Sequence, residues 1–187
     1  MLTVAYHYDL VKTRFGAAAI IWINDRQGHR IRRILLPATE EKTLREILMK
    51  FPAASRKRSD LLANFAENIR AFMEGKGPSF KTSLLDMSHV PPFHRKVLRA
   101  LVQIPKGRVR TYGEIAAKVG SPGGARAAGQ GCASNPFPIV FPCHRVIRSD
   151  GSLGGFGGGL QLKQALLDME GVRFDSAGKV KREFITP

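Results

Sequence analysis

The residues with the clearest chemistry are Cys143 and His144, which lie side by side just after the proline-rich segment 135–142. A thiolate is a strong nucleophile and nearby cations favour that form, so Arg145 and Arg148 are expected to activate Cys143. Successive side chains of an extended segment point to opposite sides, so His144 would need a turn or a bridging water to take the thiol proton. The alternative for such a pair, taken alone, is a structural thiol beside a surface imidazole.

Positive charge is concentrated around this pair. The chain has 187 residues, with 30 Lys and Arg against 15 Asp and Glu and a formal net charge of +15. Residues 91–148 hold ten of the cations and a single acid, Glu114. A localised excess of this kind is typical of a surface that binds a polyanion such as nucleic acid, and a solvated face without a partner is the alternative.

Composition excludes several classes of protein. A hydrophobic content of 43% supports packed cores, and two cysteines, Cys132 and Cys143, do not make the disulfide framework of a small secreted domain. The longest apolar run, 15–23, is shorter than the about 20 residues of a membrane span, and it lacks the flanks of a signal peptide. We therefore expect a soluble, cytoplasmic protein with no membrane partner.

The first half of the chain has an α/β pattern. Apolar runs at 17–23 and 31–36, joined by the turn sequence 24–28, predict a β-hairpin. Two helices should follow, with inward faces made by Leu44, Ile47, Leu48 and Phe51 and by Leu61, Leu62, Phe65, Ile69 and Phe72. The basic run 56–58 between them is interpreted as a solvated loop, with a targeting signal as the alternative, and the scattered histidines of this half predict no zinc site.

Two prolines, Pro91 and Pro92, mark a boundary, so we expect an α/β domain over 1–90 and a second domain over 91–187. The second domain should begin with a helix whose inward residues are Phe93, Val97, Leu101 and Ile104. Further on, Thr111 and Glu114 have the spacing of a capping box that opens a short helix. Ser121 is a candidate N-cap for another helix that runs to about Ala133. These two short helices predict a helix-turn-helix in the most basic stretch of the chain.

The second of these helices is made mainly of Gly and Ala, and Arg126 and Gln130 are its long polar side chains. Two such side chains are too few to read several base edges, so this helix is expected to dock closely on a duplex with little sequence discrimination. Arg126 would be its projecting probe. The alternative is a small-residue helix that packs against another helix.

The motif Pro142-Cys143-His144-Arg145-Val146, with Asn135-Pro136 before it, resembles the acceptor motif of the O6-alkylguanine-DNA alkyltransferases, also called methylated-DNA–protein-cysteine methyltransferases. Thr111-Tyr112-Gly113, Arg126-Ala127 and the glycine-rich segment before Leu160 match further blocks of that family in the same order. The resemblance runs from Pro92 to about Gly171. It implies a ribonuclease-H-like first domain and a mainly α, winged-helix second domain.

The resemblance also implies a role for each matching residue. Cys143 would accept an alkyl group from O6 of guanine, or less well from O4 of thymine, in double-stranded DNA. His144 would take the thiol proton through a water, Glu170 would orient the imidazole, Asn135 would support the site, and Tyr112 would donate to the departing guanine. Arg126 would fill the gap left by the flipped nucleotide, with Ala125, Ala127, Gly129 and Gln130 also against DNA.

The base itself would contact the carbonyls of Cys143 and Val146 together with Pro138, Phe156 and Gly157. Members of the family often carry Tyr and Ser in the loop that here reads 154–159, so Phe156 lacks a hydroxyl and the lid contains five glycines. The family implies a single turnover, no cofactor and no metal, and we expect a monomer. The main alternative is a non-catalytic helix-turn-helix damage sensor or regulator, and a cysteine hydrolase using Cys143, His144 and Glu170 is a weaker one.

Overall fold

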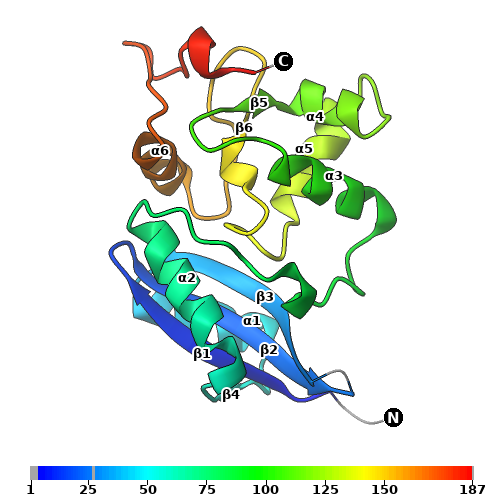
Figure 1. Ribbon diagram of the computed structural model, residues 1–187, viewed down its shortest axis with the longest axis vertical. Coiled ribbons are helices and arrows are strands. Elements are labelled where there is room, and N and C mark those ends of the chain that lie inside the picture. The colour runs from blue at the N-terminus through cyan, green and yellow to red at the C-terminus, as the bar shows by residue number, and fades with distance from the viewer. Residues whose placement is uncertain (1–3, 27, 187) are drawn as a thin grey trace. The chain divides into compact units, whose positions relative to one another are not determined.

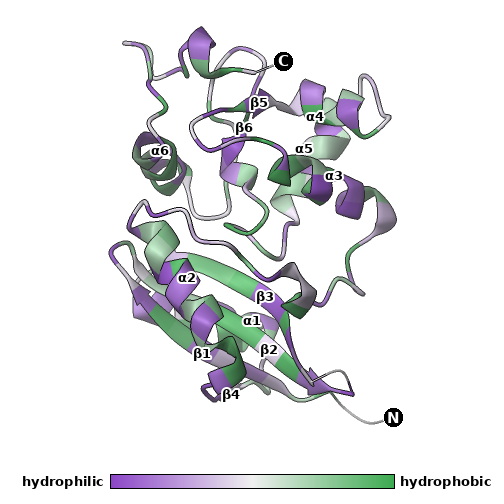
Figure 2. Ribbon diagram, in the orientation of Figure 1, coloured by the Kyte–Doolittle hydropathy of each residue, from purple (hydrophilic) through white to green (hydrophobic). Residues whose placement is uncertain are grey.

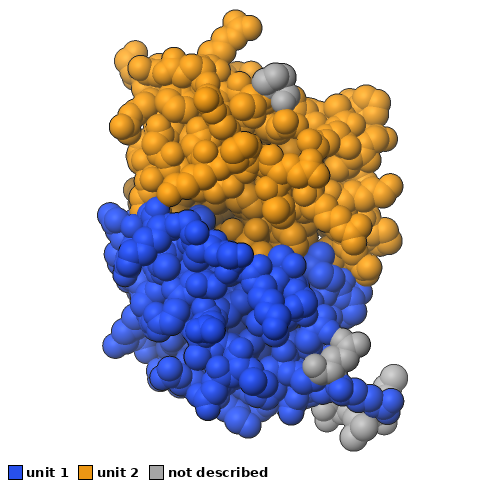
Figure 3. Space-filling view, viewed as in Figure 1, with its two compact units in different colours: residues 1–89 blue, residues 90–187 orange. Residues whose placement is uncertain are grey.

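The computed structural model describes residues 4–26 and 28–186. The chain divides into two compact units, Met1–His89 and Val90–Pro187, which Figure 3 distinguishes by colour. Gln27, in the turn expected between the first two apolar runs, lies outside the described residues.

The first unit is built on a four-stranded sheet with the order β3-β2-β1-β4 (Figure 1). Its strands are β1 Tyr6–Thr13, β2 Gly16–Asp25, β3 Gly28–Ala38 and β4 Ser55–Arg56. The expected hairpin is confirmed as the antiparallel pair β2–β3, while β1 pairs antiparallel with β2 and β4 pairs parallel with β1. Strand β1 has no sequence prediction, because it mixes polar and apolar residues that are mostly half-buried.

Two helices cover this sheet, α1 Glu40–Lys50 and α2 Ala63–Met73, with α2 in front of it and α1 behind it in Figure 1. Strand β2 is therefore buried on both faces and is largely hydrophobic in Figure 2. The prediction of an inward position is wrong for two residues, since Leu48 is 59% exposed and Leu61 is 69% exposed. Leu48 lies one position beyond the buried Ile47, and Leu61 belongs to a 3-10 turn, Asp60–Leu62, that precedes α2.

The second unit is mainly helical. Its elements are α3 Pro92–Val102, β5 Arg110–Thr111, α4 Tyr112–Lys118, α5 Ala125–Ala133, β6 Val146–Ile147 and α6 Leu160–Met169. The short strands β5 and β6 pair in parallel, and a cluster of buried apolar residues that includes Val109, Ile147 and Leu167 packs beside them. Within the described part of the chain, no helix combines the length and apolar character needed to cross a lipid bilayer.

Helices α4 and α5 make the expected helix-turn-helix, with one boundary to correct. The capping box is confirmed, since the Thr111 hydroxyl accepts from the Glu114 amide at 3.2 Å and the Glu114 carboxylate accepts from the Thr111 amide at 2.5 Å. Ser121 is not an N-cap, because α5 begins at Ala125 without a side-chain cap. Gly123 has φ +81°, a left-handed conformation that a helix cannot include.

The small residues of α5 lie on two faces of the helix, one buried and one exposed. Ala128, Gly131 and Cys132 are buried, and a Cβ at Gly131 would lie 3.2 Å from the Val97 side chain of α3. Close packing of two helices therefore explains one side of α5, as the alternative interpretation proposed. On the other side Arg126 is exposed to solvent, as are Ala127 and Gln130.

The capping box predicts a measurable difference between two hydroxyl residues. Thr111→Ala should lower the free energy of unfolding by about 1 kcal/mol, because it leaves the first amides of α4 without an acceptor. Ser121→Ala is the matched control and should change it by less than about 0.5 kcal/mol, as expected for a surface substitution that removes no cap. Urea unfolding of both variants measures this, and equal losses would contradict the assignment.

Candidate active site

Cys143 begins a 3-10 turn, Cys143–Arg145, that follows a buried loop. Asn135 fixes this loop: its Nδ2 donates to the Phe141 carbonyl at 2.9 Å and to the Cys143 Sγ at 3.3 Å, and its Oδ1 accepts from the Phe137 amide at 3.0 Å. Of the two conformations expected at Cys143 and His144, extended chain or turn, the structure has the turn, and both side chains are buried.

The carboxylate of Glu170 is the hub of the residues behind the thiol. Its Oε1 lies 3.0 Å from His144 Nε2, and Arg145 donates to both carboxylate oxygens at 2.9 and 2.7 Å. Glu170 is the C-cap of α6, where an acid is unfavourable unless a cation pairs with it, and Arg145 supplies that cation. Arg145 also donates to the Ile104 carbonyl at 2.7 Å, which ties the turn to the end of α3.

These contacts set the protonation of the pair. Burial alone would raise the pKa of Glu170, but the hydrogen bonds from His144 and Arg145 lower it to about 2. Burial lowers the pKa of His144 more than Glu170 raises it, so the imidazole is neutral at pH 7. Because the carboxylate can only accept, the His144 proton is on Nε2, and Nδ1 is the atom that can take a proton.

The electrostatic prediction for Cys143 is wrong. Its side chain is buried, and burial raises the pKa of the thiol above its usual value. Arg145 is committed to Glu170 and Arg148 lies at the exposed surface, so neither activates the sulfur. The hydrogen bond from Asn135 and the charge of Lys163 lower the pKa only in part. Cys143 is therefore a thiol until a base accepts its proton.

Lys163 is a functional candidate that the sequence interpretation missed. It is 0% exposed, and its Nζ donates to the Val146 carbonyl at 2.6 Å and to the Leu153 carbonyl. Burial lowers its pKa to about 8, and no carboxylate of the described residues forms an ion pair with it. The sequence could have indicated this burial, because Lys163 lies on the apolar stripe of α6 with Leu166 and Leu167.

A cleft of about 880 Å³ opens in front of the sulfur. Its lining residues are Tyr112, Ala125, Arg126, Gly129, Gln130, Cys132, Ala133, Cys143, Arg148, Gly155, Phe156 and Gly157. Most of the residues expected at DNA or substrate are thus brought together, from α4, α5 and the glycine-rich loop. Ala127, Pro138 and Val146 do not line this cleft, and the last two are buried.

Tyr112 closes one side of this cleft. Two glycines leave room for it: a Cβ at Gly154 would lie 3.0 Å from the Tyr112 hydroxyl, and a Cβ at Gly129 would lie 3.7 Å from its ring. The hydroxyl is 3.5 Å from the Gly155 carbonyl. Burial, with a smaller effect of Cys132 and Cys143, raises the pKa of Tyr112 to about 12. The phenol is therefore a hydrogen-bond donor at neutral pH.

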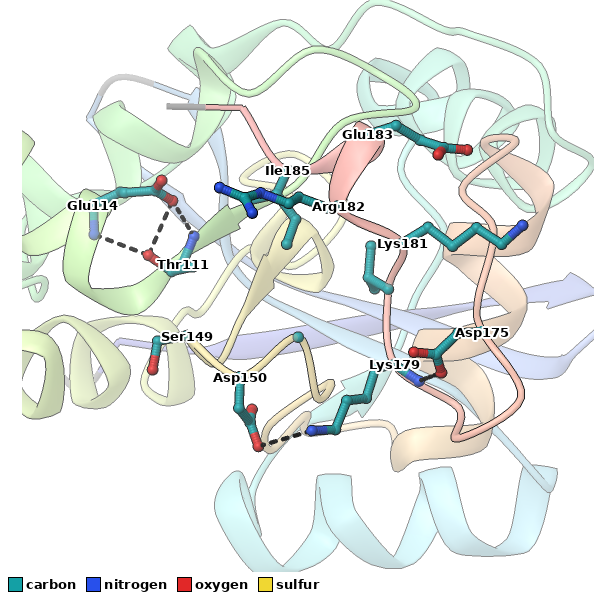
Figure 4. Close-up of a pocket in the computed structure, with 12 residues that line it drawn as sticks. Thr111, Glu114, Ser149, Asp150, Asp175, Lys179, Lys181, Arg182, Glu183 and Ile185 are labelled. Atoms are coloured by element: carbon teal, nitrogen blue, oxygen red, sulfur yellow. Dashed lines mark hydrogen bonds and ion pairs between the residues drawn. The ribbon is translucent and has the colours of Figure 1, made fainter.

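A second hollow of the same unit, about 940 Å³ in volume, carries no such chemistry (Figure 4). Three of its four acids are already engaged: Glu114 in the capping box, Asp175 with the Lys179 amide at 2.9 Å, and Asp150 with Lys179 Nζ at 3.9 Å. No cysteine or histidine is among its lining residues. Over the described ranges, no three His, Cys, Asp or Glu side chains gather as a metal site would need.

Fold and site together define a class: a two-unit chain in which a buried cysteine, backed by histidine and glutamate, lies at a cleft beside a helix-turn-helix. Residues 92–172 match the family model described as 6-O-methylguanine DNA methyltransferase, DNA binding domain. The crystal structure of Mycobacterium tuberculosis O6-methylguanine methyltransferase is similar, with a TM-score of 0.68 and 32% identity over 88% of this chain and 92% of that one. The chain belongs to the 6-O-methylguanine DNA methyltransferase family.

Individual relatives agree with this. A methylated-DNA–protein-cysteine methyltransferase of Methanothermobacter thermautotrophicus is 46% identical over 109 residues, which cover 58% of this chain and 61% of the relative. One of Mycolicibacterium paratuberculosis is 47% identical over 58% of this chain and 64% of the relative. The chain thus spans less than two thirds of these curated relatives. The structure of M. tuberculosis OGT in complex with DNA gives a TM-score of 0.70 at 32% identity, over 88% of this chain and 92% of that one.

The charge of Lys163 gives a testable pH dependence. Because a cation near the sulfur favours thiolate, Lys163→Met should raise the pKa of Cys143, move its pH–rate profile to higher pH and slow iodoacetamide alkylation several-fold at pH 7. The rate is measured in a Cys132→Ser background so that Cys143 is the thiol whose alkylation is followed. Lys163→Arg keeps the charge and is the control. An unchanged profile in the Met variant would show that Lys163 has no electrostatic effect on Cys143.

Proposed function

We propose that this chain is a direct-reversal DNA repair protein, which transfers a methyl or larger alkyl group from O6 of guanine, and less well from O4 of thymine, to its own Cys143. The observation that carries the proposal is the position of the Cys143 sulfur: it lines the cleft bounded by α5 and the glycine-rich loop, with the His144–Glu170 pair behind it. Family membership and the DNA complex of the similar M. tuberculosis protein support it.

The reaction is an in-line displacement at the alkyl carbon. The sulfur of Cys143 forms a bond to that carbon as the carbon–O6 bond breaks, and the electron pair of the broken bond stays with guanine. The thiol proton passes through a water to Nδ1 of His144, and Glu170 stabilises the imidazolium that results. Tyr112 donates its hydroxyl hydrogen bond to the guanine that leaves. The product is a thioether, which water does not readily hydrolyse, so each molecule reacts once.

Because the pKa of Cys143 is raised, the reaction needs a base, and we assign that role to His144. A buried thiol does not ionise unaided at pH 7, and a neutral His144 held by Glu170 is a base in the form that can accept a proton. Asn135 donates to the sulfur at 3.3 Å and so stabilises the developing thiolate. This order of events makes thiol deprotonation part of the reaction rather than a property of the resting protein.

DNA binding would use the exposed face of α5. A flipped nucleotide enters the cleft while Arg126 takes its place in the stack, and Ala125, Ala127, Gly129 and Gln130 face the duplex. In the cleft, the Cys143 carbonyl recognises the exocyclic amine, with Phe156 and the Gly157 amide around the base. The proposed contacts with the Val146 carbonyl and Pro138, which are buried and do not line the cleft, require these residues to become accessible when the nucleotide enters. The Val146 carbonyl already accepts from Lys163, so a bond to guanine would use its second lone pair.

Further features complete the proposal. We infer a ribonuclease-H-like topology for 1–90, a winged-helix form for the DNA-binding and acceptor domain 91–187, a cytoplasmic location and a monomeric state. Neither a cofactor nor a metal is needed for the displacement.

Intact-mass measurement tests alkyl transfer directly. After incubation with excess O6-methylguanine duplex, the protein should gain one methyl group, located on Cys143 by peptide mapping, with no further turnover. Cys132→Ser should behave like the wild type, because Cys132 is not the acceptor. Cys143→Ala should bind DNA and gain nothing. A protein that binds the duplex and never gains mass would instead be the non-catalytic damage sensor.

Nucleotide flipping is tested with two substrates. Arg126→Ala should slow repair of duplex DNA by at least about tenfold, because unstacking a base costs a few kcal/mol that the inserted side chain offsets. The same variant should react normally with the free base O6-benzylguanine, which needs no flipping. Lys42→Ala, an exposed cation of α1 that has no part in the proposed DNA-binding face, is the control for the duplex assay. Equal loss on both substrates would contradict a flipping role.

A further inference from the structure

The first unit carries a run of three adjacent cations at the edge of its sheet, Arg56, Lys57 and Arg58, which we call the basic strap. It continues from β4, the edge strand of the order β3-β2-β1-β4, and all three residues are exposed. Within the described residues, none of the three forms an ion pair with a carboxylate. Asp9 and Glu67 line a small hollow with Arg58, but Glu67 is already paired with Arg70.

The backbone of the basic strap is fixed at both ends and in the middle. Ser55, before it, bonds to His7 at 2.8 Å, and Ser59, after it, bonds to His29 at 2.7 Å. Between them the Lys57 carbonyl accepts from the indole nitrogen of Trp22 at 3.2 Å, and the Lys57 amide donates to the Tyr8 carbonyl at 2.9 Å. These bonds fix the backbone that carries the three cations.

The support of this backbone is a cluster of three tilted rings, Trp22 with His7 and His29. Trp22 is 0% exposed, and its ring lies 4.5 Å from the His7 ring and 4.4 Å from the His29 ring. Lys57 Nζ lies 6.0 Å from the Trp22 ring centroid. The pKa of His7 is lowered by burial, by Lys57 and by His29, so the positive surface adds to the cost of protonating it.

Like charges placed side by side repel, and a solvated loop would relieve that repulsion by moving. Arg58 has the acids Asp9 and Glu67 nearby and adds to the effect of Arg70 in lowering the pKa of Glu67, but in the described part of the chain it forms no ion pair with either. Cations on a fixed backbone lose less conformational freedom than a mobile loop does when they meet an anion. We infer that the basic strap is a docking surface for the phosphodiester backbone of duplex DNA, a contact additional to that of α5. This inference rests on the proposed function for the identity of the anion. It also gives a role to the excess of 15 cations over nine acids in residues 1–90.

Salt dependence of DNA binding tests the basic strap. The variant Arg56→Gln/Lys57→Gln/Arg58→Gln is compared with Lys42→Gln/Arg45→Gln/Lys50→Gln, which removes the same charge from the exposed side of α1. Affinity for an undamaged duplex is measured by fluorescence anisotropy over a series of salt concentrations. Loss of two or three phosphate contacts should reduce the slope of log K against log salt by about 2, and the α1 variant should keep the wild-type slope.

Two further measurements, Trp22 fluorescence and alkyl gain on Cys143, distinguish the possible results of the salt series. Emission of Trp22, the single tryptophan of the chain, reports whether the support stays folded, and both variants should keep the wild-type spectrum. Equal slopes for both variants would overturn the inference and leave edge-strand protection by charge as the role of the run. If the two variants have equal slopes but the protein still gains an alkyl group on Cys143, the inference fails and the proposed function stands. If the slope depends on the basic strap but no alkyl group is gained, the proposed function fails and the inference of a DNA contact stands.

Discussion

The bidentate ion pair between Arg145 and Glu170 is the contact on which the site depends. It allows a carboxylate to stay ionised at the C-cap of α6 with a side chain only 4% exposed. The same carboxylate holds His144, and the same guanidinium reaches the carbonyl at the end of α3. One pair therefore joins α6, the turn that carries Cys143 and α3. A buried pair of this kind loses much when either partner is removed, because the remaining charge has no compensation.

The charges around the sulfur keep Cys143 in its less reactive thiol form. The thiol is buried, the nearby arginines are engaged or exposed, and Lys163 and Asn135 give only partial support to the thiolate. A low-pKa cysteine would react with any small electrophile that entered the cleft, whereas a thiol that needs a base, the role we propose for His144, reacts when a substrate is held in line with it. The residues of the site thus suit a protein that can use its nucleophile once.

The two units use positive charge in different ways. Cations of the second unit surround a helix-turn-helix whose α5 packs through Gly131 on α3 and leaves Arg126 exposed. Those of the first unit include a fixed run at a sheet edge, supported by Trp22 between two imidazoles. In both places small or aromatic residues below the surface determine where the charge is presented.

Local sequence determined the hairpin β2–β3, the capping box of α4, the helix-turn-helix and the candidate nucleophile, because each depends on residues close together in the chain. It did not determine strand β1, the exposure of Leu48 and Leu61, or the start of α5, since these depend on what packs against them. The protonation of Cys143 was beyond it for the same reason. Arg145 is two residues from Cys143 yet serves Glu170, and Lys163, twenty residues away along the chain, is the cation that affects the thiol, since distance in space sets an electrostatic effect.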